Sequence, residues 1–142
     1  HIAGQDALQR TIEARAKAEL AEVMRDAAVG RSGADAVRSI AAEYRRWAKA
    51  HPGRYAATLA APDPADADAL AASVRAVDVL RDALAAYGLE GDDEIDAIRT
   101  LRSGLHGFVA LEAAGGFGLP LDVDRSYVLI VDALVATLPS GR

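Results

Sequence analysis

The side chains that could carry out chemistry are few in this sequence, and their spacing fits no familiar site. The three histidines are His1, His51 and His106, and none stands in a metal-binding pattern such as His-Glu-x-x-His. The carboxylates gather in two runs, 63–68 and 92–96, which suit helix N-termini before they suit acid–base catalysis. Cysteine is absent and no serine has an activating neighbour. We therefore expect no catalytic residue, no metal and no cofactor, and an enzyme is disfavoured.

One short stretch stands out instead, because it concentrates the large aromatic side chains. YRRWAKAHPGRY, residues 44 to 55, holds three of the seven aromatic residues, namely Tyr44, Trp47 and Tyr55. Aromatic rings with polar tips either fill a core or line a cavity that binds a small apolar molecule. The residues themselves leave both possibilities open.

Composition predicts the fold class that must position these residues. Alanine occurs 33 times, while β-branched and aromatic residues are sparse, which favours an all-α fold. The net charge of −5 argues against nucleic-acid binding by this chain, since phosphate recognition needs a basic surface. No signal peptide is visible, and no run of about 18 apolar residues could span a bilayer. We expect a soluble cytoplasmic protein without membrane contacts.

Apolar residues recur at three- and four-residue steps, which predicts a bundle of about six helices. Leu8, Ile12 and Leu20 form the stripe of the first helix, and charged residues, including Lys17, fill its opposite face. Asp63 is the expected N-cap of the fourth helix and Pro64 its first residue, whereas Pro52 should end the second. The fourth helix should bury Leu70, Val74, Val77, Leu80, Leu84 and Tyr87 and end at Gly88. The predicted helices cover residues 5–29, 34–51, 54–61, 64–87, 91–114 and 123–138.

Two glycines inside the fifth helix require an explanation. Gly104 and Gly107 each cost about 1 kcal/mol relative to alanine in a helix interior. A missing Cβ allows another helix to approach closely, and the last helix is apolar over a wide arc. The approach could occur within one chain, or between two copies that form a four-helix dimer interface.

Three segments in order resemble the C-terminal regulatory domain of the TetR family of transcriptional repressors, in the group named for a Trp-His-Gly signature. HIAGQDAL at positions 1–8 is similar to the seam between the DNA-binding domain and the connecting helix. YRRWAKAHPGRY resembles the family's aromatic-rich turn. LRSGLHGFVALEAAGGFG, residues 101–118, is similar to the signature helix, with His106 and Gly107 in the expected places. Arg102 stands where the signature has tryptophan, which is a departure from the family's pattern at that position.

The resemblance implies a regulatory domain over residues 1–142 that binds a small hydrophobic effector and forms a homodimer. A helix-turn-helix domain that would precede residue 1 would bind DNA, and the effector would tilt the first helix and so alter operator binding. The implied effector contacts are Tyr44, Trp47, Tyr55, Leu59, Val74, Val77, Leu80, Leu101, Leu105, His106 and Phe108. The implied dimer contacts are Gly104, Gly107, Leu111, Tyr127, Ile130 and Leu134. A helical interaction module without a ligand and a small all-α enzyme remain alternatives.

Overall fold

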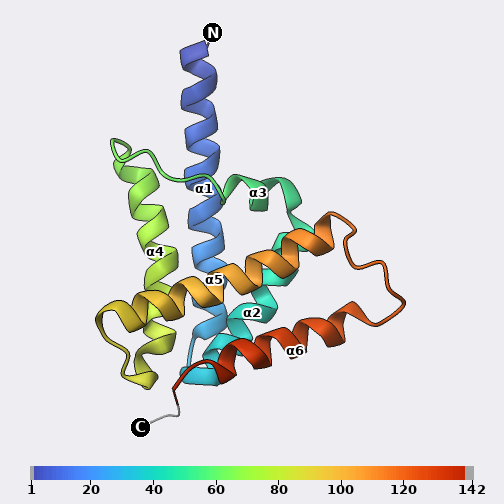
Figure 1. Ribbon diagram of the computed structural model, residues 1–142. Coiled ribbons are helices and arrows are strands. Elements are labelled where there is room, and N and C mark those ends of the chain that lie inside the picture. Colours follow the sequence, from blue (N-terminus) through green and yellow to red (C-terminus); the bar gives the residue numbers. More distant parts are fainter. Residues whose placement is uncertain (1, 140–142) are drawn as a thin grey trace.

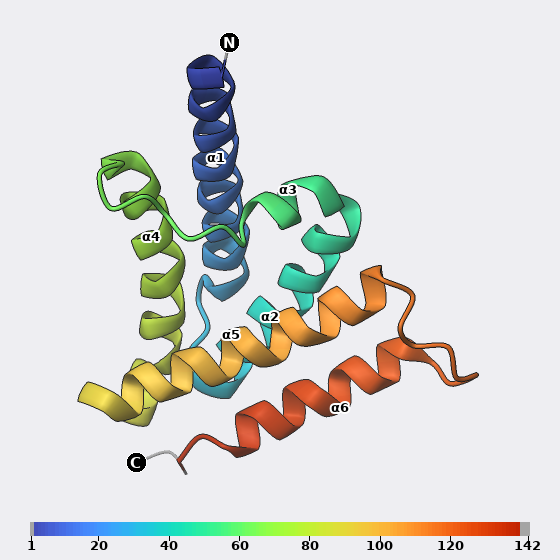
Figure 2. The same ribbon diagram turned by 45° about the horizontal axis from the view of Figure 1, so that its top comes forward.

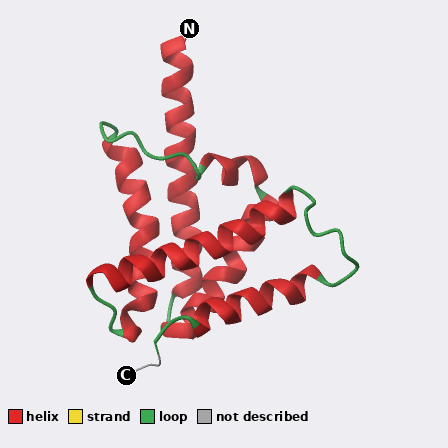
Figure 3. Ribbon diagram, in the orientation of Figure 1, coloured by secondary structure: helices red, strands yellow, loops and turns green. Residues whose placement is uncertain are grey.

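The computed structural model describes residues 2–139, and in this part of the chain all regular structure is helical (Figure 3). The predicted all-α class is therefore confirmed. Six α-helices and one short 3₁₀ helix follow each other through short connections. Their order is α1 (Ile2–Ala28), α2 (Gly33–Ala50), α3 (Pro52–Ala57), α4 (Ala67–Leu84), η1 (Ala85–Tyr87), α5 (Gly91–Ala113) and α6 (Val123–Ala136).

The helices form two groups, with α5 and α6 lying side by side across the others (Figures 1 and 2). The most extensive helix–helix contact joins α1 to α4, which run in the same direction. Ala16 and Ala21 of α1 and Ala69 and Ala72 of α4 are buried. Small side chains on both helices let the two axes approach closely. Across residues 2–139, no helix is both long enough and apolar enough to cross a membrane.

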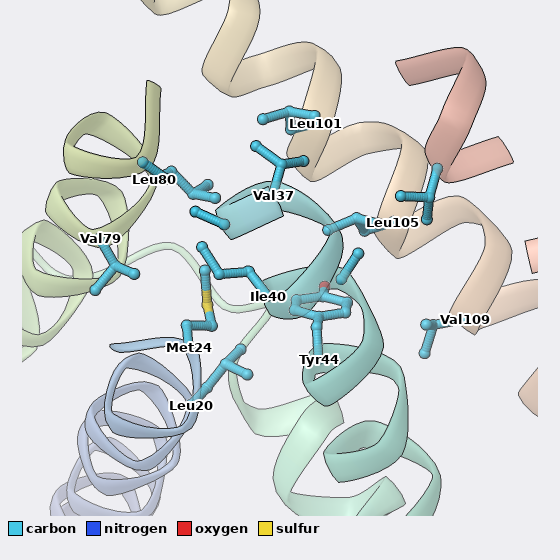
Figure 4. Close-up of a cluster of buried hydrophobic side chains, with 14 of the residues drawn as sticks. Leu20, Met24, Val37, Ile40, Tyr44, Val79, Leu80, Leu101, Leu105 and Val109 are labelled. Atoms are coloured by element: carbon cyan, nitrogen blue, oxygen red, sulfur yellow. The ribbon is translucent and has the colours of Figure 1, made fainter. Parts of the chain in front are cut away.

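A single hydrophobic core lies where α1, α2, α4 and α5 meet (Figure 4). Ile40 of α2 lies at its centre. The side chains of Ile40, Leu84 of α4 and Leu101 of α5 are each 1% exposed. Met24 and Leu20 reach this core from α1. Burial of these side chains supplies the main driving force that holds α5 on the other helices.

Proline and glycine mark the helix ends largely as predicted. α2 ends at Ala50 with His51 as its C-cap, and Pro52 is the first residue of α3. Gly88 has a φ of +66° and terminates the 3₁₀ turn after α4, which confirms the predicted stop. The short third helix is real, but it covers Pro52–Ala57 rather than residues 54–61.

The predicted start of the fourth helix is wrong by one turn. Asp66, not Asp63, is the N-cap, and its carboxylate accepts hydrogen bonds from the backbone N–H groups of Asp68 and Ala69. Asp63 instead accepts from the N–H of Ala65 at 2.9 Å and forms a turn that contains Pro64. The backbone hydrogen bond from Asp66 N to Asp63 O, 2.9 Å, closes this turn before the helix begins.

The predicted apolar stripes of α1 and α4 are also partly wrong. Leu8 and Ile12 are 61% and 43% exposed, and Leu70 and Val74 are 38% and 54% exposed. Ala69 and Ala72 of α4 are buried, whereas the larger side chains in the first half of this helix are exposed. A stripe drawn through large residues alone therefore misses a helix face that packs through alanine.

Candidate functional site

A chain of hydrogen bonds joins the aromatic stretch to α5. The hydroxyl oxygens of Tyr44 on α2 and Tyr55 on α3 lie 2.5 Å apart. The Tyr55 hydroxyl also lies 2.7 Å from Nδ1 of His106 on α5. The Tyr44 and Tyr55 rings meet edge to face with centroids 5.6 Å apart, while the Tyr55 and His106 rings stack at 5.9 Å. The structure thus brings together three of the predicted site residues from three helices.

The two tyrosine hydroxyls stay neutral at physiological pH. Burial raises the pKa of Tyr44, and burial also raises the pKa of Tyr55 far above its ordinary value. The positive charge of Arg102, an exposed side chain, acts against both shifts. It is located one helical turn before His106 on α5. The site therefore offers neutral hydrogen-bonding groups.

Trp47 is buried, with 6% of its surface exposed. Its indole Nε1 donates a hydrogen bond to Glu19 Oε1 of α1 at 3.2 Å. The same carboxylate oxygen accepts from Arg54 Nη1 at 3.0 Å. The ring also lies beside His51, with centroids 5.6 Å apart. Trp47 therefore couples the aromatic stretch directly to the long helix α1.

Lys17 is the one buried charged residue in the described part of the chain, at 8% exposure. Its Nζ donates a hydrogen bond to the backbone carbonyl of Ala60, in the segment after α3. Burial lowers the pKa of Lys17; Glu13 raises it and Arg102 lowers it. The expectation that Lys17 lies on the solvent face of the first helix is therefore wrong. Lys17 lies three residues before Leu20, at the edge of the apolar stripe, and this spacing could have indicated that its side chain is buried.

The implied effector contacts fall into two sets. Tyr44, Trp47, Tyr55, Leu80, Leu101, Leu105 and Phe108 are buried, and Val77 and His106 are half-buried. Leu59 and Val74 are 51% and 54% exposed, so neither lies on an inner wall. Leu59 follows the end of α3, and Val74 lies in the first half of α4.

Pockets occur elsewhere on the surface. One of about 460 Å³ is lined by Arg10, Asp63 and residues 65–68 near the start of α4. Another of about 320 Å³ lies between the C-terminal halves of α1 and α4, beside Arg25 and Arg75. Neither includes Trp47 or Tyr55. Within residues 2–139, no three histidine, aspartate or glutamate side chains gather in a way that could hold a metal ion.

A second cluster, which sequence reasoning missed, fixes α2 to α5 and α6. Arg45 binds Glu112 through two hydrogen bonds, Nε to Oε1 at 2.9 Å and Nη2 to Oε2 at 2.8 Å. Its Nη1 lies 2.7 Å from a carboxylate oxygen of Asp124 at the start of α6. The guanidinium also lies over the rings of Phe108 and Tyr127, at 5.8 and 5.1 Å from their centroids. The hydrogen bonds from Arg45 hold the pKa of Glu112 below its ordinary value.

The implied dimer contacts divide between the interior and the surface. A Cβ on Gly104 would come within 2.7 Å of Leu134 Cδ1, so the close approach at Gly104 occurs within the chain, between α5 and α6. Tyr127 is 5% exposed and its hydroxyl donates to the Ala41 carbonyl at 2.6 Å, so it offers a second copy almost no surface. In contrast, a Cβ on Gly107 would meet nothing within 4 Å, and Leu111 is 53% exposed. Ile130 and Leu134 are partly buried against the core.

Comparison with known proteins matches this architecture to a family of regulators. A family described as "Tetracyclin repressor-like, C-terminal domain" matches residues 37–134. Rv0681 of Mycobacterium tuberculosis, described as an uncharacterized HTH-type transcriptional regulator, is 33% identical over 138 residues. That alignment covers 96% of this chain but only 62% of the relative, so the chain spans less than two thirds of its length.

Two solved structures share the fold. SCO4313, a proposed regulatory protein, superposes with a TM-score of 0.77 at 24% identity, covering 94% of this chain and 75% of that one. A protein of unknown function from Rhodococcus sp. RHA1 superposes with a TM-score of 0.78 at 21% identity, covering 95% of this chain and 75% of that one. At these identities the likeness establishes the helical arrangement.

Proposed function

Because the chain belongs to the family of tetracycline-repressor-like C-terminal domains, we propose that it is the effector-binding and dimerisation domain of a TetR-like transcriptional regulator. This proposal rests on the hydrogen bonds that link Tyr44, Tyr55 and His106. They place polar groups inside an otherwise apolar junction of α2, α3 and α5. Apolar sites with a few convergent polar groups are typical of small-molecule recognition. We assign the chain to the Trp-His-Gly group through His106 and Gly107, with Arg102 replacing the tryptophan.

We propose that the DNA-binding function belongs to a helix-turn-helix domain outside these residues. The acidic charge of −5 is unsuited to a phosphate backbone, and the Mycobacterium tuberculosis relative is longer than this chain. α1 would connect that domain to the site. The chain should show no sequence-selective gel shift by itself.

The proposed allosteric route runs through α1. Glu19 of α1 accepts a hydrogen bond from Trp47, and Lys17 of α1 donates one to the segment after α3. An effector that enters beside Tyr55 would disturb both contacts and so favour a different inclination of α1. The effector changes operator affinity only if it binds the two inclinations with different affinity.

The proposed dimer uses the outer face of α5 and α6. These two helices pack on the rest of the chain with one side and leave the other uncovered (Figure 2). Gly107 and Leu111 lie one turn apart on that uncovered side of α5, where a partner helix could approach closely.

A second candidate function, a helical interaction module without a small ligand, is favoured by one observation. Leu101, Leu105 and Trp47 are at most 6% exposed, and the two pockets lie away from them. An effector would then have to open its own space between α3 and α5.

The two candidates differ in the response of Trp47 to small molecules. Trp47 is the only tryptophan, so its fluorescence reports on one position. A broad set of apolar and amphipathic compounds should include some that shift its emission saturably and raise the melting temperature, because they bind only the folded state. Trp47→Ala should remove the signal, and a melting-temperature screen of that variant would show weaker binding. No response to any compound would favour the interaction module.

A further inference from the structure

The segment between α2 and α4, residues 52–66, contributes little to the hydrophobic core. It consists of the six-residue helix α3 and of residues 58–66, which form turns and loop. In Figures 1 and 2 it passes across α1 on its way to the start of α4. Tyr55 is its only buried residue, whereas α2 buries eight residues and α5 buries five. Detachment of this segment therefore exposes much less apolar surface than detachment of either long helix.

Two polar contacts join the segment to α1. Arg54 Nη1 lies 3.0 Å from Glu19 Oε1, and the two side chains are 57% and 40% exposed. The same Glu19 oxygen accepts the indole N–H of Trp47. Farther along the segment, the carbonyl of Ala60 accepts a hydrogen bond from Lys17. When the segment moves, water can replace the partners in both contacts, so their net contribution to holding it is small.

The third attachment point lies at the proposed effector site. The Tyr55 hydroxyl contacts the Tyr44 hydroxyl and Nδ1 of His106, so a movement of Tyr55 frees both groups for another partner. The two pockets described above include neither Tyr55 nor Trp47. A ligand of these residues therefore needs an opening that the closed segment does not provide.

We propose that residues 52–66 form a strap that opens as one unit and admits the effector to Tyr44, Trp47 and His106. This inference rests on the proposed effector function and specifies how its site becomes accessible. The strap turns about its two ends, where the backbone leaves helical geometry. His51 has φ −133° and ψ 63°, and Asp66 has φ −95° and ψ 98°. Because opening breaks both contacts with α1, the state of the strap is linked to the inclination of that helix.

Hydrogen exchange of the ligand-free chain, followed by NMR, tests the opening directly. The backbone N–H groups of Tyr55 and Thr58 donate to carbonyls within the segment at 2.8 and 3.2 Å. They should be protected at least about a hundredfold less than the amide of Ile40 in the core. The indole N–H of Trp47, a single signal, should report the same free energy of opening as these two amides. Exchange as slow as that of Ile40, or unequal free energies at the three reporters, would overturn the strap.

A cross-link tests whether the strap must leave α1. The chain has no cysteine, so Glu19→Cys with Arg54→Cys can be bridged by a short bis-maleimide. The same double variant capped with two N-ethylmaleimide groups lacks the ion pair but is free to open. The bridge should slow exchange at Tyr55 and at the Trp47 indole about tenfold or more relative to the capped form. Equal exchange in the two forms would overturn the proposed movement.

A second bridge, between α4 and α5, is the matched control. Arg81 Nε lies 2.7 Å from Glu94 Oε1, and these side chains are 47% and 24% exposed. Bridged Arg81→Cys with Glu94→Cys should exchange at Tyr55 like its own capped form. If this bridge slowed exchange at Tyr55 as strongly as the first one, the opening would be part of global unfolding and the strap would be excluded.

The exchange experiments use no effector, so their result is separate from that of the compound screen. A compound that shifts Trp47 emission should associate about tenfold or more slowly with the bridged Glu19→Cys, Arg54→Cys protein than with its capped form. Equal association rates would overturn admission through the strap. The absence of any binding compound would instead count against the proposed effector function, and exchange alone would then decide whether the strap opens.

Discussion

The hydroxyl of Tyr55 lies 2.7 Å from Nδ1 of His106, which ties the six-residue helix α3 to the C-terminal half of α5. The same hydroxyl lies 2.5 Å from that of Tyr44, so a single oxygen connects three helices. Tyr55 is 6% exposed, so water cannot easily replace either partner. α3 is thus held by the polar group that we place in the effector site.

Removing that oxygen should destabilise the protein. Tyr55→Phe leaves the Tyr44 hydroxyl and His106 Nδ1 without their shared partner, at a cost of about 1–3 kcal/mol in the free energy of unfolding. Tyr87→Phe is the control, because Tyr87 is half-buried and its hydroxyl makes no hydrogen bond within the described residues. Urea unfolding of both variants measures the difference. Equal stabilities would show that the hydrogen-bond chain contributes nothing net.

The Arg45 cluster should make a larger contribution. Arg45→Met leaves Glu112, whose side chain is 16% exposed, without its two hydrogen bonds. We expect a loss of about 1.5–3 kcal/mol, the range for hydrogen bonds to charged groups. Arg46→Met, which breaks an ion pair at a 73% exposed side chain, should cost about 0.5 kcal/mol or less. Similar losses for the two variants would contradict this assignment.

The pH dependence of this cluster has a definite sign. The pKa of Glu112 in the folded protein is below its ordinary value of 4.5, chiefly because Arg45 donates hydrogen bonds to the carboxylate. The resulting stabilisation is present above the unfolded-state pKa and is lost as the pH falls through the folded-state pKa. Stability should therefore drop less between neutral and acidic pH in Arg45→Met than in the wild type. Urea midpoints measured across that range give the comparison, and parallel curves would exclude a role for this pair.

The corrected N-cap of α4 gives a further prediction. Asp66→Ala removes two backbone hydrogen bonds at the helix start and should cost about 1 kcal/mol. Asp63→Ala removes one turn hydrogen bond before the helix and should cost clearly less. Thermal unfolding of the pair distinguishes the two aspartates. A larger loss at Asp63 would move the helix start back to the sequence-based position.

Signals within a few residues of each other predicted the helix ends and the fold class. Pro52 and Gly88 fixed helix ends through backbone geometry alone, and the alanine-rich composition correctly indicated an all-α fold. Arg45 and Glu112 are 67 residues apart, so their pairing depends on how α5 crosses α2, which no local pattern encodes. Lys17 was misplaced for a related reason. Its stem can lie along an apolar face while its ammonium reaches a backbone carbonyl, and charge alone suggested solvent.

The two glycines of α5 separate packing within the chain from dimer formation. Gly104 faces Leu134 of α6, and a leucine there would force α6 outward, so Gly104→Leu should destabilise the single chain. Gly107 faces open space, and replacing a helical glycine by leucine gains up to about 1 kcal/mol of helix propensity. Gly107→Leu should therefore leave the single chain at least as stable and still prevent close approach of a second copy. Leu111→Glu should also prevent dimer formation, because it places a charge in the proposed interface.

Light scattering should give a dimer for the wild type and monomers for Gly107→Leu and Leu111→Glu. Val74→Glu is the matched control, because Val74 is 54% exposed, close to the 53% of Leu111, but lies on α4 away from the proposed interface. It should remain dimeric. The melting temperature of the wild type should rise with protein concentration, since association stabilises the folded state, whereas that of Gly107→Leu should not. A monomeric wild type with a concentration-independent melting temperature would remove α5 and α6 as a dimer interface and leave Gly107 without a packing role.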